Sequence, residues 1–156
     1  MREMTHEEVR AFITGNRFGY LGLADDGRAY VIPLFYAYDG RTFWFHANPG
    51  LKDEYIARTR EACLTVVRAW SEDEWESVIA SGPIRPVDFQ EEAARAMDAL
   101  MAVPMPPAYG VTEHGEPRRA GEPGFRFLKL EPEVITGRSS ARPRNADADR
   151  IATRGM

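Results

Sequence analysis

The strongest constraint on the fold is a pair of Asp-Gly turns near the start of the chain. They stand at 25–27 and 39–40 and separate three runs rich in β-branched and aromatic residues, at 17–24, 28–38 and 41–47. Asp-Gly pairs between such runs are typical of tight β-hairpins, because both residues tolerate the positive φ angles of these turns. The pattern therefore predicts three antiparallel strands joined one after another.

Further strands are predicted later in the chain. Three more strand-like runs lie at 62–70, 75–87 and 125–136. Because strands mostly follow strands without crossover helices, the pattern favours a small antiparallel barrel over a parallel α/β sheet. We therefore expect a mainly β (α+β) fold, in which a six-stranded antiparallel β-barrel carries about three flanking helices.

Two of these helices are predicted by capping patterns. Thr5 and Glu8 form a capping box for a helix that begins at residue 6, and Gly15 can supply a left-handed residue at its end. Asn48 is expected to cap a second helix, with Pro49 at its first position, that continues to about residue 60.

The third helix is expected to follow Asp88, which forms a capping pattern with Glu91. Its predicted apolar face consists of Phe89, Ala93, Met97, Leu100 and Met101. Prolines after residue 103 stop the helix. The segment 103–124 is a Pro- and Gly-containing insertion that we expect to cross the surface.

Length and charge restrict the class of protein. A chain of 156 residues fits one domain of ordinary size. Its net charge of −4 disfavours a generic nucleic-acid-binding protein, which needs a basic face. Positive charge gathers at 137–156, where five arginines face two aspartates. We expect a barrel domain at 1–138 and a basic tail at 139–156 that wraps the surface or stays mobile, with RNA contact by the tail as an open alternative.

Cysteine content and apolar runs bear on the cellular compartment. Cys63 is the only cysteine, so no intrachain disulfide can form, and its apolar neighbours predict a small buried side chain. The first ten residues are charged, and the longest mostly apolar run, 30–38, is too short to span a membrane. These features predict a cytoplasmic protein that is not associated with a membrane.

Lys52 is the first residue that indicates a binding site. The chain has eighteen arginines and only two lysines, and Lys52 falls in the first turn of a predicted helix. The helix dipole makes a cation unfavourable there, whereas helix N–H groups and a lysine together form a phosphate site. Two interpretations remain open: an anion-binding lysine, or a solvated lysine beside an ordinary cap.

His46 is the second such residue. It ends a predicted strand, shares a face with Thr42 and Trp44, and stands just before the turn that carries Lys52. Its ring could contact a ligand or could be structural. The three histidines have no metal-ligand spacing and no cysteine cluster accompanies them, so we expect no metal site.

Pro33 and its aromatic neighbours complete the candidates. Pro33 cannot donate to a strand ladder, so one side of its strand must be an edge, a bulge or open to a small molecule. The aromatic residues of 35–38 and 43–45 are expected to form core, although some of them could flank a flat ring. No nucleophilic triad, phosphate-binding glycine loop or carboxylate pair is evident, so an enzyme of this sequence would rely on a cofactor.

Short motifs form a recognisable series along most of the chain. They are Gly22-Leu23-Ala24, the run 26–33, Tyr36, Tyr38-Asp39-Gly40, Phe45-His46-Ala47, Gly50, Lys52 and Thr136-Gly137-Arg138. In this order and spacing the chain resembles the pyridoxamine 5′-phosphate oxidase-like FMN-binding split-barrel family, and within it the nitroimidazole-resistance (Nim-type) branch.

The resemblance implies a six-stranded split barrel that forms a homodimer and holds two FMN molecules in clefts between the subunits. It implies that the isoalloxazine lies along Val31, Pro33, Leu34 and Tyr36, that the ribityl phosphate meets His46, Ala47, Asn48 and Lys52, and that Trp75 and Ser77 reach the partner's flavin. His46 is the candidate catalytic residue, with a wall of the pocket as its alternative role.

The function that the resemblance implies is that of an FMN-dependent oxidoreductase, which passes a hydride or electrons from reduced flavin to a small acceptor such as a nitroaromatic compound. Ala47 and Leu51 stand where family members often have Ser or Thr and Arg, so two phosphate contacts are absent. Alternatives are a split barrel that binds F420 or haem, and a non-enzymatic binding or regulatory dimer with an empty or ligand-sensing cleft.

Overall fold

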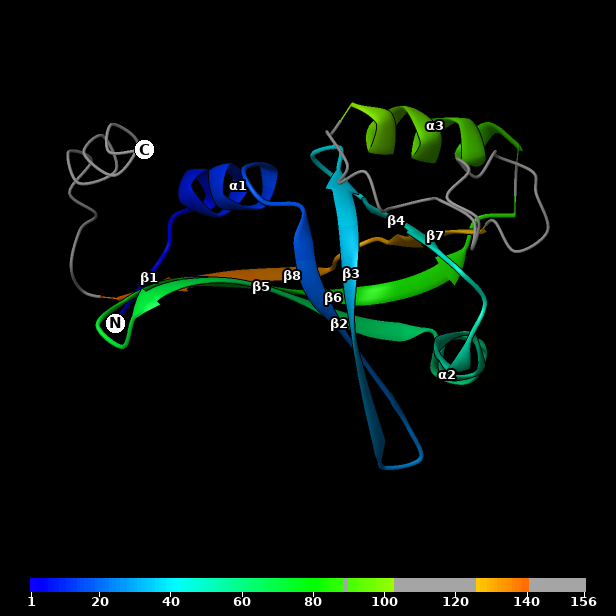
Figure 1. The fold of residues 1–156 in the computed structure, drawn as a ribbon, viewed down its shortest axis with the longest axis horizontal. Helices are drawn as coiled ribbons and strands as arrows, with labels where there is room; N and C mark the ends of the chain where they lie inside the picture. The colour runs from blue at the N-terminus through cyan, green and yellow to red at the C-terminus, as the bar shows by residue number, and fades with distance from the viewer. Residues whose placement is uncertain (89, 103–125, 141–156) are drawn as a thin grey trace, which may run out of the picture.

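The computed structural model describes residues 1–88, 90–102 and 126–140, which form the eight strands and three helices of Figure 1. The strands are β1 (Arg2–Glu3), β2 (Phe18–Asp25), β3 (Arg28–Tyr38), β4 (Phe43–Ala47), β5 (Glu61–Ser71), β6 (Glu74–Pro86), β7 (Arg126–Leu130) and β8 (Val134–Ser139). The helices are α1 (His6–Thr14), α2 (Leu51–Thr59) and α3 (Gln90–Met101). The insertion at 103–124, Phe89 and the tail from residue 141 lie outside the described residues.

Six of the strands close into an antiparallel barrel. Neighbouring strands follow the order β1-β8-β6-β5-β2-β3-β4-β7, and an additional pairing of β6 with β7 joins the two ends of the set β2 to β7. β8 and β1 extend the sheet beyond β6. The prediction of a mainly β fold, with a six-stranded antiparallel barrel and three helices, is confirmed.

The single strand predicted at 125–136 is wrong, because the chain divides there into β7 and β8. Both strands pair with β6, β8 near its start and β7 near its end. Between them the chain passes so close to Gly82 that a Cβ atom there would lie 2.5 Å from the carbonyl oxygen of Glu131. The N–H groups of Glu131 and Glu133 donate to the carbonyls of Pro83 and Ser81 at 3.0 and 2.9 Å, which fixes this crossing.

The predicted hairpin turns are confirmed. Asp26 and Gly27 have φ angles of 47° and 75°, the positive values that a two-residue β-hairpin turn requires. At the second turn Gly40 has a φ angle of 96°, and the Asp39 carboxylate accepts N–H groups from Arg41 and Thr42 at 2.9 and 2.7 Å. The backbone angles and hydrogen bonds of each turn come from the residues of the turn itself, which is why the sequence is sufficient to predict both.

Helix α1 begins as predicted but ends differently. The Thr5 hydroxyl accepts the N–H of Glu8 at 3.2 Å, and the Glu8 carboxylate accepts the N–H of Thr5 at 2.8 Å, which is a complete capping box. Gly15 has a φ angle of −79°, so the predicted left-handed end is wrong. The Asn16 side-chain amide donates to the carbonyl of Phe12 at 2.6 Å instead, which satisfies one of the terminal carbonyls without a left-handed residue.

Helix α3 rests on the outside of the barrel. Its buried residues Ala96 and Leu100 pack against Ala37, Trp44 and Phe127 in a cluster separate from the barrel interior. Met101 does not join this face, contrary to the prediction, because 75% of its surface is exposed at the end of the helix.

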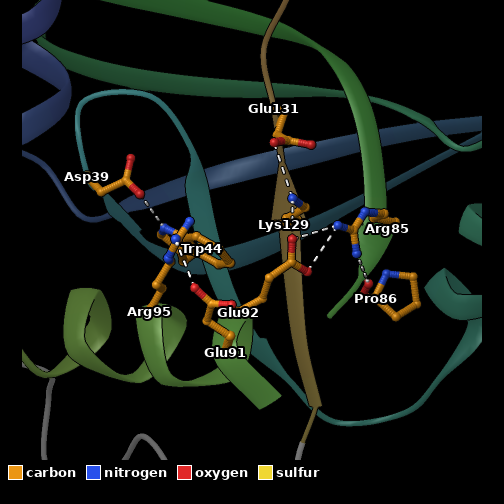
Figure 2. A network of polar contacts seen from close by, with 9 residues as sticks. All are labelled: Asp39, Trp44, Arg85, Pro86, Glu91, Glu92, Arg95, Lys129 and Glu131. Atoms are coloured by element: carbon orange, nitrogen blue, oxygen red, sulfur yellow. Dashed lines mark hydrogen bonds and ion pairs between the residues drawn. The ribbon is translucent and has the colours of Figure 1, made fainter. Parts of the chain in front are cut away.

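A network of charged side chains also ties α3 to the barrel, as Figure 2 shows. The Glu92 carboxylate accepts from Lys129 Nζ of β7 at 2.8 Å and from Arg85 Nη2 of β6 at 2.8 and 3.0 Å. Lys129 Nζ also lies 3.2 Å from Glu131 Oε1. The network therefore joins α3 to two strands that close the barrel.

The barrel interior is filled by large apolar side chains, among them Leu21, Phe45, Leu64 and Leu128. Cys63 is not part of this core, contrary to the prediction. It is half-buried on the opposite face of β5, where its Sγ atom lies 3.9 Å from the hydroxyl of Thr65. The strand alternation explains the error, because residues next to one another in a strand point to opposite faces of the sheet.

The end of the described chain is attached to the sheet. β8 continues through Ser139, and the N–H of Ser140 donates to the carbonyl of Trp75 at 2.9 Å. The first residues of the predicted tail thus belong to the sheet edge. In the part of the chain that the structure describes, no helix is long and apolar enough to cross a membrane.

Candidate functional site

The site is built around an edge of β3 that β4 leaves uncovered. β3 pairs with β2 from Arg28 to Phe35, whereas β4 pairs with β3 only from Tyr36 to Tyr38. On its other side β4 pairs with β7 along its whole length. The second edge of β3 over residues 28–35, the open edge of β3, therefore pairs with no strand of the described chain. Figure 1 shows the β2–β3 hairpin extending beyond the barrel at this point.

Pro33 lies on the open edge, where its missing N–H costs no hydrogen bond to a neighbouring strand. The N–H of Tyr36 donates to the carbonyl of Arg17 on the β2 side at 2.8 Å. Because backbone groups alternate along an antiparallel strand, the backbone groups of Val31 and Pro33 face the open edge. The side chains of Val31 and Pro33 are exposed, whereas those of Leu34 and Tyr36 point into the barrel core. The expectation of an edge at Pro33 is confirmed.

The turn after β4 differs in detail from its predicted form. α2 begins at Leu51 with Gly50 as its N-cap, so the prediction of Asn48 as cap and Pro49 as first helical residue is wrong. The Asp53 carboxylate supplies the reason, because it accepts the N–H of Gly50 at 2.6 Å and so caps the helix from inside its first turn. Lys52 keeps its predicted place in that turn.

Lys52 is buried rather than solvated. Its side chain is only 8% exposed, which rules out the solvated-lysine interpretation. The ammonium donates to the carbonyl of Asn48 and lies 3.5 Å from Asp53 Oδ2. Burial of a charged group is unfavourable unless it is paired and hydrogen-bonded, so these contacts hold the ammonium against the turn. The structure thus places a cation at the start of a helix, next to backbone donors.

The other residues predicted near this turn are less polar. His46 is half-buried at the end of β4, and its ring lies edge-on to Phe127 with 6.2 Å between the ring centroids. Ala47 points into the core, and Leu51 is exposed. Neither Ala47 nor Leu51 has a side chain that can donate a hydrogen bond. Within the predicted phosphate-binding residues, Lys52 therefore supplies the positive charge.

Trp75 and Ser77 lie elsewhere in the same chain. Both are half-buried residues of β6, which is separated from β3 by β5 and β2. With strands spaced about 4.8 Å apart, β6 lies roughly 14 Å from β3 across the sheet. One chain therefore does not bring these two residues to the open edge of β3.

Strands β3, β2, β5, β6 and β8 form an outer sheet face. We define it by its exposed apolar residues Phe18, Tyr20, Val31, Val67, Ile79 and Val134. Register joins them into rows: Tyr20 stands opposite Pro33 and Thr65, and Thr65 stands opposite Ile79. Helix α1 packs on the other side of this sheet (Figure 1). Exposed apolar residues that gather on one sheet face indicate a candidate protein–protein interface.

Sequence reasoning did not identify this surface. Its signal was present, because Tyr20, Val67 and Ile79 directly adjoin the core residues Leu21, Val66 and Val78, so these strands are apolar on both faces. A strand with one solvated face would instead alternate apolar and polar residues.

Few of the described residues are candidates for an acid, a base or a metal ligand. Burial raises the pKa of the Tyr36 phenol far above its ordinary value, and its hydroxyl donates to the carbonyl of Ile13 at 2.8 Å, so Tyr36 is a structural residue. In the ranges that the structure describes, no group of three or more His, Cys, Asp or Glu side chains could hold a metal ion. His46 remains the titratable side chain at the end of β4.

The chain matches a known protein family over most of its length. The family model described as pyridoxamine 5′-phosphate oxidase matches residues 5–139. The chain belongs to that family. An uncharacterized protein of Rhizobium meliloti strain 1021 is 24% identical over 82 residues, and the match spans about half of each protein, 53% of this chain and 54% of the other.

Solved structures share the split-barrel fold of this pyridoxamine 5′-phosphate oxidase family member. A FAD-binding protein from Mesorhizobium loti has a TM-score of 0.71 and 24% identity, over 90% of this chain and 97% of the other. A candidate 5-nitroimidazole antibiotic resistance protein from Bacteroides thetaiotaomicron has a TM-score of 0.67 and 19% identity, over 87% and 85%. A FAD and haem binding protein from Mycobacterium smegmatis has a TM-score of 0.67 and 15% identity, over 100% and 82%.

Proposed function

We propose that this chain is an FMN-dependent oxidoreductase of the Nim type, which passes a hydride or electrons from reduced flavin to a small acceptor such as a nitroaromatic compound. The observation that carries the proposal is the buried ammonium of Lys52 at the start of α2, in the turn that follows the separation of β4 from β3. Relatives described as FAD-binding and as a nitroimidazole resistance protein support a flavin and this type of acceptor.

The donor chemistry of the residues fits a phosphorylated flavin. Lys52 and the start of α2 suit the phosphate, because a helix N-terminus and a lysine both favour an anion. Val31 and Pro33 offer exposed apolar surface for the ring. Leu34 and Tyr36 of the same strand pack into the barrel core and so fix its position. His46, Ala47 and Asn48 form the adjoining end of β4 and its turn. Since Ala47 lacks a donor, Lys52 supplies most of the side-chain affinity for the phosphate.

FMN would supply the hydride or electron transfer itself. The residues of the chain bind and orient the ring, and they exclude water from it through the apolar surface of Val31 and Pro33. We assign to His46 the role of the group that holds and releases a proton, because an imidazole titrates near neutral pH. A wall of the pocket is the alternative role for this residue.

A homodimer completes the proposed site. Trp75 and Ser77 are three strands away from the open edge of β3 in the same chain, so they would contact a flavin bound by a partner. The outer sheet face is the proposed contact, because it lies between the two sets of residues and is apolar. A stable interface of ordinary size buries about 800 Å² on each partner, which a sheet face of several strands can provide.

Paired titrations with FMN and riboflavin test the phosphate assignment. Lys52→Ala should weaken FMN binding by about 1.5–3 kcal/mol, the loss of a charge-assisted contact, and leave riboflavin binding unchanged. Fluorescence quenching of each flavin measures both affinities. Arg95→Ala on α3, which removes an exposed cation far from the turn, is the matched control. Equal losses for FMN and riboflavin, or no loss in Lys52→Ala, would contradict the proposal.

The absorbance spectrum of freshly purified protein separates the alternatives. Flavin bands support the proposed function, a Soret band supports a haem protein of the kind seen in the relative that binds FAD and haem, and an F420 spectrum supports a deazaflavin protein. A chain that shows no chromophore and does not quench added FMN would be the non-enzymatic binding or regulatory dimer. The absence of donors at Ala47 and Leu51 is the observation in favour of that last alternative.

A further inference from the structure

We propose that Asp53 is an internal competitor of the phosphate and that it limits the affinity of the lysine turn for phosphorylated ligands. This inference rests on the proposed function, because it concerns the same Lys52 site. It assigns to Asp53 a role in selectivity: the carboxylate holds donors that a phosphate monoester requires.

The contacts of Asp53 are those of a bound anion. Its Oδ2 atom accepts the N–H of Gly50 at 2.6 Å and lies 3.5 Å from the ammonium of Lys52. One carboxylate oxygen therefore meets a backbone donor and a lysine at the start of α2. Anions at helix N-termini are held by this combination of groups.

Burial makes the competition effective. The Lys52 side chain is 8% exposed and that of Asp53 is 21% exposed, so solvent screens their charges only partly. The charge of Asp53 already offsets the positive end of the helix dipole and neutralises the ammonium. A phosphate dianion that approaches Lys52 thus meets a compensated cation and a nearby like charge, and like charges in a partly buried site disfavour one another.

The backbone donors at this turn are already occupied. A Cβ atom at Gly50 would lie 3.8 Å from Lys52 Nζ, so the ammonium rests directly against the backbone of the turn. The N–H of Gly50 goes to Asp53, and the N–H of Asp53 goes to the carbonyl of Gly50 at 3.0 Å. A phosphate must share or displace the Asp53 carboxylate to reach the N–H of Gly50 and the ammonium of Lys52.

The test replaces the charge and keeps the hydrogen bond. Asp53→Asn retains a side-chain oxygen for the N–H of Gly50 but removes the negative charge beside Lys52. Glu54→Gln is the matched control, because it makes the same change of charge on the next residue of α2, whose side chain is exposed. Dissociation constants for FMN and riboflavin are measured by fluorescence quenching for both variants, for the wild type and for Lys52→Ala.

We expect Asp53→Asn to bind FMN roughly ten-fold more tightly than the wild type and riboflavin equally well, a gain consistent with the removal of one close like charge at partial burial. Glu54→Gln should change FMN affinity by less than about two-fold, because an exposed charge is well screened. The increase in melting temperature on addition of FMN should also be larger for Asp53→Asn than for the wild type. If Asp53→Asn does not fold, Asp53→Ser removes the same charge and keeps a hydroxyl as the acceptor.

The outcomes separate this inference from the proposed function. If Asp53→Asn leaves FMN affinity unchanged or weakens it while Lys52→Ala weakens it selectively, the competitor role is wrong and the flavin site stands. An equal gain in Glu54→Gln would likewise overturn the role of Asp53, since general electrostatics would then explain the effect. If no variant distinguishes FMN from riboflavin, or no chain binds either, the proposed function itself fails.

Discussion

Neutralising Glu92 is expected to destabilise the fold far more than neutralising its neighbour Glu91. Glu92 is the shared acceptor of the network in Figure 2, where it receives Lys129 Nζ at 2.8 Å and Arg85 Nη2 at 2.8 Å. Glu92→Gln preserves the shape of the side chain and removes its charge. Among the described residues, Lys129 would then keep a single carboxylate partner, Glu131, at 3.2 Å.

The burial of the partners sets the magnitude. Lys129 is 8% exposed, and removal of one partner from a buried ion pair costs about 3–5 kcal/mol. Glu92 itself is 20% exposed and Glu131 still compensates part of the lysine charge, so the expected loss is about 2–3 kcal/mol. Glu91 is 83% exposed and contacts only Arg95 among the described ion pairs, at 3.3 Å, so Glu91→Gln should cost less than about 0.5 kcal/mol.

Urea unfolding of the two variants measures the difference at neutral pH. Hydrogen bonds from Lys129 and Arg85 hold the pKa of Glu92 below its ordinary value of 4.5, against burial, which raises it. A lowered pKa in the folded state means that this stability is present above pH 4.5 and is lost as the pH falls through the folded-state pKa. The wild type and Glu92→Gln should therefore converge in acid. Equal free energies of unfolding for the Glu91 and Glu92 variants at neutral pH would refute the reasoning.

Two further predictions concern the assembly and the proposed proton-transfer group. Ile79→Glu on the outer sheet face should convert the proposed dimer into monomers in sedimentation equilibrium and lower FMN affinity, since each site would lose the partner's residues; a variant that remains dimeric counts against this interface. His46→Ala should remove one limb of the pH profile of turnover while FMN affinity stays within about two-fold of the wild type. An unchanged profile would leave His46 as a wall of the pocket.

The parts of the fold that the sequence predicts correctly are governed by local contacts. The capping box of Thr5 and Glu8 and the Asp-Gly turns satisfy their hydrogen bonds and backbone angles within a few residues. The division of 125–136 into two strands depends instead on Gly82, which lies far away in the chain and against which the backbone of Glu131 packs. Apolar periodicity carries no information about such an approach, so the strand was predicted as continuous.

In the candidate site, too, the sequence predicts local features but not contacts that depend on the folded backbone. The scarcity of lysine and the helix start indicated that Lys52 is unusual, and its burial agrees with that indication. The actual helix start depends on Asp53, whose carboxylate reaches back to Gly50, and a preference for Asn and Pro at caps does not reveal this contact. Trp75 and Ser77 are placed away from the open edge by the strand order, which the sequence pattern did not determine.

The open edge of β3 also bears on how the protein avoids aggregation. An unpaired strand edge is a template on which a strand from another molecule can add, and repeated addition leads to fibres. Pro33 lies in the middle of that edge with no N–H to offer, so an incoming strand meets a break in the ladder. Pro33, which we propose lies along the flavin, therefore also protects the chain from uncontrolled polymerisation.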